Sequence, residues 1–199
     1  LEERRDKIRG LLISHGHLDH IGGIPYIIDR IGNPLIYTRR LTGRMIAKRQ
    51  EEFTQTTPVQ IREVEKDEVL LLGSHKVRFF GVTHTVPDSM GIIIETPYGG
   101  IVTPGDIKLE HENGIPSERE VAEYDRFEKE KVLLLMMDST NVDNPGFSTP
   151  EKLVHKNLEE IIRNTKRRLI IGTFASQLER IIAIIEAAER NGKKVVVEG

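Results

Sequence analysis

The sequence predicts an α/β fold in two parts, and three observations support this prediction. In residues 1–148, apolar segments with the period of strands are joined by short turns, as between Gly91–Thr96 and Gly100–Thr103. After Pro150, helical and strand-like segments alternate, which predicts parallel strands with right-handed crossovers. Hydrophobic residues make up 38% of the chain and charged residues 30%, a composition typical of a globular protein that buries a core.

The apolar periodicity of the first part separates its expected strands from its expected helices. A continuous apolar run over 10–14 predicts a buried strand, and the pair Asn33-Pro34 predicts a break after the first helix. We expect strands over 10–14, 35–37, 69–72, 77–83, 91–96, 100–103 and 132–137, and helices over 21–31, 41–52 and 117–131.

The second part begins where Thr149 and Pro150 predict the N-cap and first position of a helix. Apolar residues on one face of that helix predict that it packs against a core: Val154, Leu158, Ile161 and Ile162. A strand over 169–174, a helix over 177–190 that stops before Gly192, and a strand over 194–198 are expected to follow. We therefore predict two domains, 1–148 and 149–199.

Composition limits the class of protein and of metal site. Cysteine is absent, so any transition-metal site must use histidine and carboxylate ligands. The net charge of -2 gives no overall basic field, so a nucleic-acid substrate would have to bind in a local basic groove. No apolar run approaches the ~18 residues of a membrane span, and no signal peptide is visible, so we expect a cytoplasmic protein without a membrane partner. A charged start without Met and an apolar end suggest a piece of a longer protein.

The densest chemical signal is the motif His15-Gly16-His17-Leu18-Asp19-His20, directly after the first expected strand. Side chains alternate along an extended segment, so His15 and His17 can bind one ion, and Gly16 lets the backbone approach closely. Asp19 and His20 follow and face a second position. Neutral imidazole and carboxylate are ligands that Zn²⁺ or Mn²⁺ would use. Since the chain has seven histidines in all, three within six positions argue against an accidental polar turn.

Two side chains at later strand ends are further candidates for the same site. His84 follows one expected strand, and Asp106 follows Gly105 after another. Ligands on strand ends that converge at one edge of a sheet form rigid sites, although each residue alone could belong to an ordinary turn. The remaining histidines lie in charged surroundings and are predicted to be surface residues: His75, His111 and His155.

The motif HGHLDH, the later His84 and the segment TPGD over 103–106 resemble the metallo-β-lactamase superfamily. This resemblance implies an αββα sandwich without its N-terminal strands. It also implies two zinc ions with a divided ligand set: His15, His17 and His84 on one ion, Asp19 and His20 on the other, and Asp106 bridging both. The superfamily hydrolyses lactams, thioesters and other esters, so the motif alone does not define the substrate.

Four longer segments are more specific, namely LLISHGHLDHIGGIPY, THTVPDSMGI, LLLMMDSTNVDNPGFS and GTFASQLERI. In this order they resemble the bacterial ribonuclease J family, in the β-CASP branch of the superfamily. The resemblance implies that 149–199 begins a β-CASP domain with parallel strands. It further implies a cytoplasmic ribonuclease, a homodimer or tetramer at full length, with endonuclease activity and 5′-to-3′ exonuclease activity on 5′-monophosphorylated RNA.

The same resemblance assigns roles outside the metal ligands. It implies that Asp138 donates a proton to the leaving oxygen, and that Ser176 and Gln177 contact RNA phosphate. A helix N-terminus with free N–H groups suits a phosphate, although Ser176 could equally be a plain N-cap. Many relatives have Asn where this chain has Gln177, which puts the side-chain contact in question more than the backbone contact.

The implied mechanism uses two divalent ions, zinc or manganese, about 3.5–4 Å apart, which lower the pKa of a shared water and clamp the scissile phosphate. Asp106 would hold both ions and thus acts with Asp138 in catalysis. A last metal ligand and the 5′-phosphate pocket are expected outside residues 1–199, so the isolated chain should bind metal weakly and be poorly active. Three alternatives stay open: a thioesterase on the same scaffold, a DNA-directed nuclease, and a non-catalytic RNA-binding or assembly module.

Overall fold

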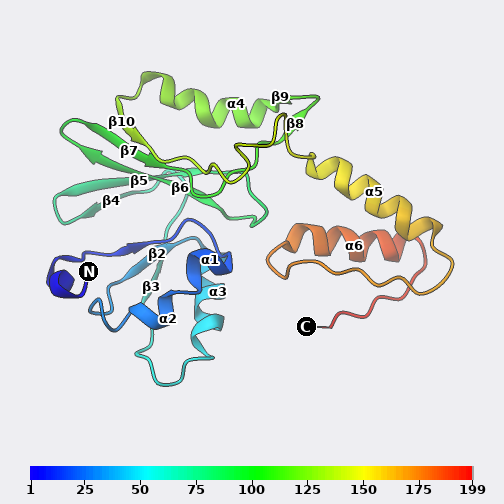
Figure 1. Ribbon diagram of the computed structural model, residues 1–199, viewed down its shortest axis with the longest axis horizontal. Helices are drawn as coiled ribbons and strands as arrows, with labels where there is room; N and C mark the ends of the chain where they lie inside the picture. The colour runs from blue at the N-terminus through cyan, green and yellow to red at the C-terminus, as the bar shows by residue number, and fades with distance from the viewer. Residues whose placement is uncertain (199) are drawn as a thin grey trace.

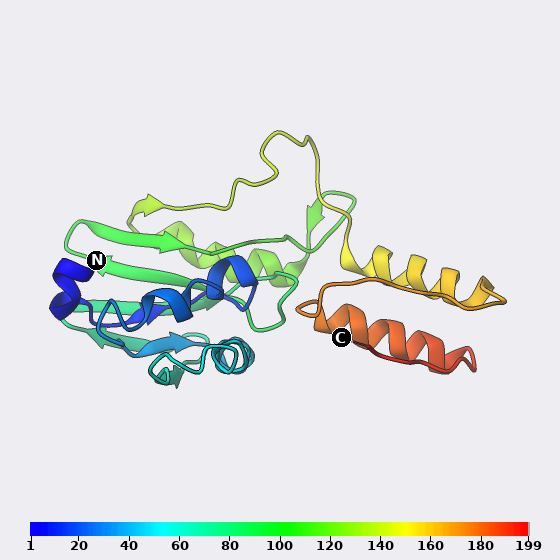
Figure 2. The same ribbon diagram turned by 60° about the horizontal axis from the view of Figure 1, so that its bottom comes forward.

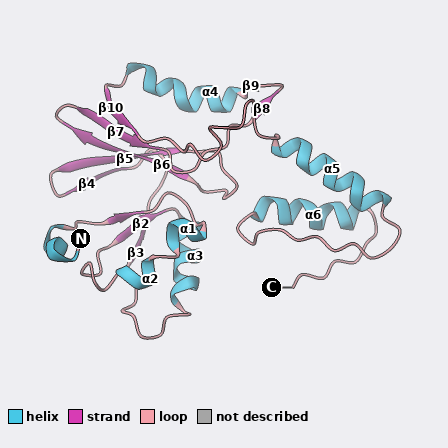
Figure 3. Cartoon of the chain, in the orientation of Figure 1, coloured by secondary structure: helices cyan, strands magenta, loops and turns pink. Residues whose placement is uncertain are grey.

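Two β-sheets face each other across an apolar layer, and helices cover their outer faces, in the computed structural model, which describes residues 1–198 (Figure 1). The first sheet has three parallel strands in the order β1-β2-β3, and the second has five strands in the order β10-β7-β6-β5-β4. Helices α1, α2 and α3 lie against the first sheet, and α4 lies against the second (Figure 3). This arrangement confirms the αββα sandwich expected from the sequence.

The first sheet and its helices come from the first third of the chain. Their bounds are η1 Glu2–Lys7, β1 Leu11–Leu12, α1 Leu18–Ile21, α2 Ile24–Ile27, β2 Ile36–Thr38, α3 Arg40–Gln50 and β3 Ile61–Glu63. The single helix expected over 21–31 is wrong: two short helices form, separated at Gly22 and Gly23, because glycine disfavours a continuous helix. Strand β3 was not predicted, because its three residues include only one apolar side chain.

All strands expected in the second sheet form within two residues of their predicted bounds. The bounds are β4 Val69–Leu72, β5 His75–Gly81, β6 Met90–Thr96, β7 Gly99–Thr103 and β10 Val132–Leu135. A small hairpin of β8 His111–Glu112 and β9 Ile115–Pro116 precedes α4 and was not predicted. The expected helix over 117–131 is shorter: α4 Glu118–Tyr124 continues as the 3-10 helix η2 Asp125–Lys129.

The alternation of side chains along β5 and β6 places both faces of the second sheet in a core. Phe79 and Ile92 are buried between the two sheets, whereas their neighbours Phe80 and Ile93 are buried on the side of α4. This is the period of two expected of a strand covered on both faces. Complete burial of such a side chain contributes roughly 1.5–3 kcal/mol, so these positions anchor the scaffold of the site.

Strand β10 forms the outer edge of the second sheet and pairs in parallel with β7. Its side chains remain exposed, unlike those of β6. Between this edge, the sheet and α4 lies an apolar cavity of about 520 Å³, which Phe80, Val121 and Met137 help to line. No residue of the histidine motif lines this cavity.

Residues 150–198 contain two helices that pack on each other, α5 Glu151–Asn164 and α6 Leu178–Arg190 (Figure 2). Ile162 of α5 and Ala187 of α6 belong to a core cluster of their own. Pro150, rather than the expected Thr149, is the N-cap of α5. Gly192 follows α6 with a positive φ of 64°, as expected for a glycine that ends a helix. No helix within 1–198 is long and apolar enough to cross a membrane.

The parallel strands expected over 169–174 and 194–198 are not formed, which corrects the predicted start of a β-CASP sheet. Figure 2 shows both segments running beside α6 without a neighbouring strand. An apolar run becomes a strand only where another strand offers N–H and C=O partners, and none is available to either segment within 1–198. Ile170 and Val196 accordingly stay exposed.

Candidate metal centre

The histidine motif starts where the chain leaves β1, at a point where the two sheets are tied together. The carbonyl of Ser14 accepts a hydrogen bond from the N–H of Met90, at the start of β6, at 3.0 Å. On the other side, the hydroxyl of Thr38 donates to the carbonyl of Ile13 at 2.9 Å. A Cβ at Gly16 would lie 2.5 Å from the sulfur of Met45 in α3, so the close approach inferred from the sequence is present. The motif is therefore held on rigid elements.

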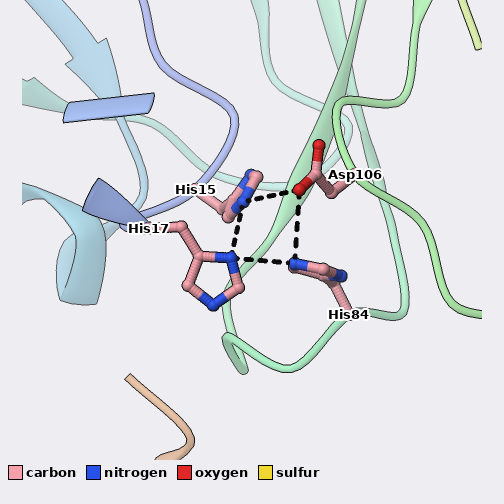
Figure 4. Close-up of side chains that lie close together, drawn as sticks. All are labelled: His15, His17, His84 and Asp106. Carbon is pink, nitrogen blue, oxygen red and sulfur yellow. Dashed lines mark hydrogen bonds and ion pairs between the residues drawn. The ribbon is translucent and has the colours of Figure 1, made fainter. Parts of the chain in front are cut away.

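Four ligand atoms of the first group converge within 4.8 Å of one another (Figure 4). They belong to His15, His17, His84 and Asp106. The Nδ1 atom of His17 lies 3.1 Å from the Nε2 atoms of both His15 and His84. One oxygen of Asp106 lies 3.6 Å from His15 Nε2 and 3.9 Å from His84 Nε2. The structure thus brings His84 and Asp106 to the motif from distant strand ends.

A second group of three ligand atoms adjoins the first, and Asp106 belongs to both. The other carboxylate oxygen of Asp106 lies 3.2 Å from His20 Nε2. Asp19 completes the group, with an oxygen 3.6 Å from the same nitrogen, although its side chain is 76% exposed. The two oxygens of Asp106 therefore face two different sets of ligands, which is the geometry of a carboxylate that could bridge two ions.

The histidines of the first group are neutral at neutral pH. Burial, reinforced by the nearby histidines, lowers the pKa of His15 to about 3. Burial and the neighbouring His17 lower the pKa of His84 to about 4, and burial also lowers the pKa of His17. Three neutral imidazoles and a carboxylate in one place form the donor set that zinc prefers. The residues present therefore fit a metal site.

Two hydroxyl groups contact the outer nitrogens of the ligand histidines. Ser14 Oγ lies 3.0 Å from His15 Nδ1, and Thr85 Oγ1 lies 3.2 Å from His17 Nε2. Such contacts fix the orientation of metal-binding rings. We did not single out these residues from the sequence, although both are direct neighbours of predicted ligands. The Nδ1 atom of His84 is buried and has no partner within residues 1–198.

The loop that carries Asp106 depends on a glycine. Gly105 has a φ of +69°, and a Cβ there would lie 2.6 Å from Ser14 Oγ. Two residues beyond Asp106, the N–H of Lys108 donates to the carbonyl of Thr83 at 2.8 Å, directly before His84. The Asp106 loop is thus fixed against the segment that precedes His15 and against the segment that precedes His84.

The other predicted site residues lie near this cluster but differ in position. Asp138 is close enough for its charge to act on His15 and His84. Its Oδ1 accepts the N–H of Thr140 at 2.9 Å, a contact that holds the pKa of Asp138 below its ordinary value. Gln177 lines a small cavity of about 60 Å³ together with His84. Ser176 is not among the residues that line it, and Gln177 rather than Ser176 is the N-cap of α6.

One histidine predicted to be a surface residue is buried. The Nε2 atom of His111 lies 2.8 Å from the carbonyl oxygen of Ser148, and the ring of Phe147 covers it. The prediction was wrong because the covering segment lies more than thirty positions further along the chain. His75 is exposed, as expected, and His155 is half-buried beside Glu151.

Comparison with known proteins agrees with this geometry. A family model described as the metallo-beta-lactamase superfamily matches residues 1–143. The chain belongs to the metallo-β-lactamase superfamily. A crystal structure of a protein of unknown function from Enterococcus faecalis V583 matches this superfamily member with a TM-score of 0.66 at 21% identity, over 89% of this chain and 44% of that chain.

Curated relatives extend the similarity over the whole chain, as the sequence segments suggested. Ribonuclease J of Mycoplasma genitalium is 36% identical over 200 residues, which cover 100% of this chain and 35% of that protein. Ribonuclease J2 of Bacillus subtilis is 32% identical and ribonuclease J of Thermus thermophilus 36% identical, each covering 100% of this chain and 36% of the relative. The chain thus spans about a third of the length of these relatives.

Proposed function

We propose that this chain carries the metal centre of a ribonuclease that hydrolyses RNA phosphodiester bonds. The observation that carries the proposal is the position of Asp106 between two ligand groups, one with three imidazoles and one with Asp19 and His20. The similarity to ribonuclease J proteins supports RNA as the substrate. A phosphodiester gathers negative charge in its transition state, and a site for two cations suits that chemistry.

The residues of the site hold and orient rather than react directly. Two divalent ions, zinc or manganese, would supply an activated water and neutralise the charge on the phosphate when bound. Asp106 keeps the two ligand groups in register through its separate oxygens. Ser14 and Thr85 orient the rings of His15 and His17, so the nitrogen lone pairs stay directed to one point.

For Asp138 we propose a role other than the proton donor that the resemblance implies. A proton donor to the leaving oxygen needs a pKa close to the working pH, whereas the hydrogen bond from Thr140 lowers the pKa of Asp138. Bound cations nearby would lower it further. We therefore assign Asp138 as an ionised carboxylate beside His84, and we assign the phosphate contact to Gln177 rather than to Ser176.

The finer parts of the proposal follow the resemblance to ribonuclease J. They are a preference for 5′-monophosphorylated RNA, both endonuclease and 5′-to-3′ exonuclease activity, a homodimer or tetramer at full length, and a cytoplasmic location. We also propose that 1–148 and 149–199 are separate domains. The separate core of α5 and α6 around Ile162 supports this boundary.

A cleavage assay on the full-length gene product tests the function. Matched RNA and DNA oligonucleotides, with a 5′-monophosphate or a 5′-triphosphate, are incubated with Zn²⁺, with Mn²⁺ or with EDTA. We expect metal-dependent cleavage of RNA, faster with the monophosphate. Cleavage that persists after the metals are stripped would rule out this mechanism. Cleavage of DNA but not of RNA would show that DNA is the substrate instead.

A further inference from the structure

We infer that Glu151 is a positioning residue, which orients the side-chain amide of Gln177 as a hydrogen-bond donor to an RNA phosphate beside the metal centre. The inference rests on the proposed function and goes beyond it, because Glu151 is neither a metal ligand nor a residue that contacts the ligand cluster. It lies in the first turn of α5, 26 positions before Gln177.

Glu151 receives three charge-assisted hydrogen bonds. Arg180 of α6 donates from Nε at 2.8 Å to one oxygen and from Nη2 at 2.9 Å to the other. Lys108 Nζ donates at 2.9 Å to the second oxygen. Burial alone would raise the pKa of Glu151, but the bonds from Lys108 and Arg180 outweigh it and hold that pKa below its ordinary value. Glu151 is therefore ionised, and its fork-to-fork pairing fixes the plane of the guanidinium group.

The fixed guanidinium group in turn fixes the amide of Gln177. The remaining nitrogen of Arg180, Nη1, donates to Gln177 Oε1 at 2.8 Å, and the hydroxyl of Thr173 donates to the same oxygen at 3.0 Å. Arginine can only donate, so the oxygen end of the amide must face it. The two N–H donors of the amide are left for another acceptor, which suits an anionic oxygen.

The network places this donor next to the metal ligands. Gln177, Glu151 and Arg180 line the small cavity that also contains His84. Lys108 reaches Glu151 with its side chain, while its N–H is bonded to Thr83, directly before His84. Lys108 and Arg180 both direct their charged donors at Glu151, so the group that is left with free, oriented donors is the neutral amide of Gln177. A donor aimed at a phosphate adds a hydrogen bond to the bound substrate, so loss of its orientation should weaken substrate binding.

The test compares two matched substitutions in the full-length protein. Glu151→Gln removes the charge that holds Arg180, and Glu159→Gln is the control, because Glu159 pairs with Arg190 across the same two helices at 3.3 Å but on an exposed surface. With a single-stranded RNA oligonucleotide, we expect Glu151→Gln to raise KM about tenfold and to lower kcat less than about threefold, since a contact remote from the reacting atoms contributes to binding. Glu159→Gln should leave both within about twofold of wild type.

A double-mutant cycle gives a second test of the coupling between Glu151 and Gln177, and this test does not depend on one variant. Gln177→Ala should raise KM as much as Glu151→Gln, and the double variant should be no weaker than Gln177→Ala alone. Arg180→Lys, which keeps the charge but loses the fork, replaces Glu151→Gln if circular dichroism shows that the latter is unfolded. The inference is overturned if the effects multiply, if kcat falls as much as KM rises, or if Glu151→Gln equals Glu159→Gln. Absence of RNA cleavage by the wild type would instead reject the proposed function, and the inference with it.

Discussion

The carboxylate of Asp88 accepts a hydrogen bond from the N–H of Leu41 at 2.6 Å, across 47 positions of sequence. Its second oxygen lies 3.2 Å from the hydroxyl of Thr42. Arg39, the N-cap of α3, makes no side-chain cap, so Asp88 satisfies the helix N-terminus from a distant loop. Because that loop begins at His84, the same contact ties a predicted metal ligand to the helix that packs against the motif.

This contact predicts that Asp88→Ala weakens both the fold and the site. Loss of a helix cap costs about 1–2 kcal/mol, and the freed loop should also reduce the affinity for zinc. Urea unfolding and competition with a zinc chelator measure the two effects. Asp88→Asn keeps an acceptor oxygen and should lose less on both counts. Equal stability of Asp88→Ala and wild type would show that α3 does not need this cap.

The shared carboxylate predicts how metal content responds to substitution. In the full-length protein, elemental analysis should find two ions per chain for the wild type, about one for His17→Ala, and fewer than one for Asp106→Ala, because Asp106 belongs to both ligand groups. His17→Ala should abolish hydrolysis and leave RNA binding largely intact. His75→Ala, which removes an exposed imidazole outside the cluster, is the control. Full metal occupancy in Asp106→Ala would contradict a bridging role.

The sequence predicted the cluster of histidine and aspartate side chains better than its surroundings. His15, His17, Asp19 and His20 are close in sequence, so the motif was visible directly. His84 and Asp106 could be added because each directly follows an expected buried strand, and the ends of such strands converge at one edge of the sheet.

What the sequence did not show depends on long-range contacts. The hydrogen bond from Leu41 to Asp88 and the pairing of Glu151 with Arg180 join distant segments, and neither segment of a pair has a sequence pattern that identifies the other. The same limit applies to the two strands expected after Pro150. Both segments are apolar, but a strand also needs a neighbouring strand to pair with, and the periodicity of one segment cannot reveal that neighbour.

The tight approach of Gly105 to Ser14 predicts that Gly105→Ala is more damaging than backbone strain alone. A non-glycine residue at positive φ costs of order 1–3 kcal/mol, and a Cβ there would also collide with Ser14. Gly192→Ala is a matched control, since its φ of +64° is nearly the same as +69° at Gly105, but nothing lies within 4 Å of its Cβ. Thermal unfolding should show a larger loss for Gly105→Ala, and that variant alone should lose metal affinity. Equal losses would leave strain as the sole cause.

The lowered pKa values of the ligand histidines predict that acid destabilises the metal-free protein. Below about pH 6.5, the unfolded chain takes up protons on His15 and His84, whereas the folded chain keeps them neutral down to about pH 3 and 4. The unfolded state therefore binds more protons, and the free energy of unfolding falls as pH drops from 6.5 toward 4. Each group contributes up to about 1.4 kcal/mol per pH unit in this range.

Urea unfolding in EDTA at pH 7.5, 6.0 and 5.0 measures this slope. We expect His15→Gln and His84→Gln each to reduce the slope, because each removes one group that the folded state keeps from protonating. His75→Gln should not change it, since His75 is exposed on β5 and lies outside the cluster. Zinc should steepen the same dependence, because protons compete with the ion for the imidazole nitrogens. A flat profile between pH 7.5 and 5.0 in the metal-free wild type would mean that the buried rings accept protons freely. The site would then lack the neutral imidazole nitrogens that the proposed metal centre requires.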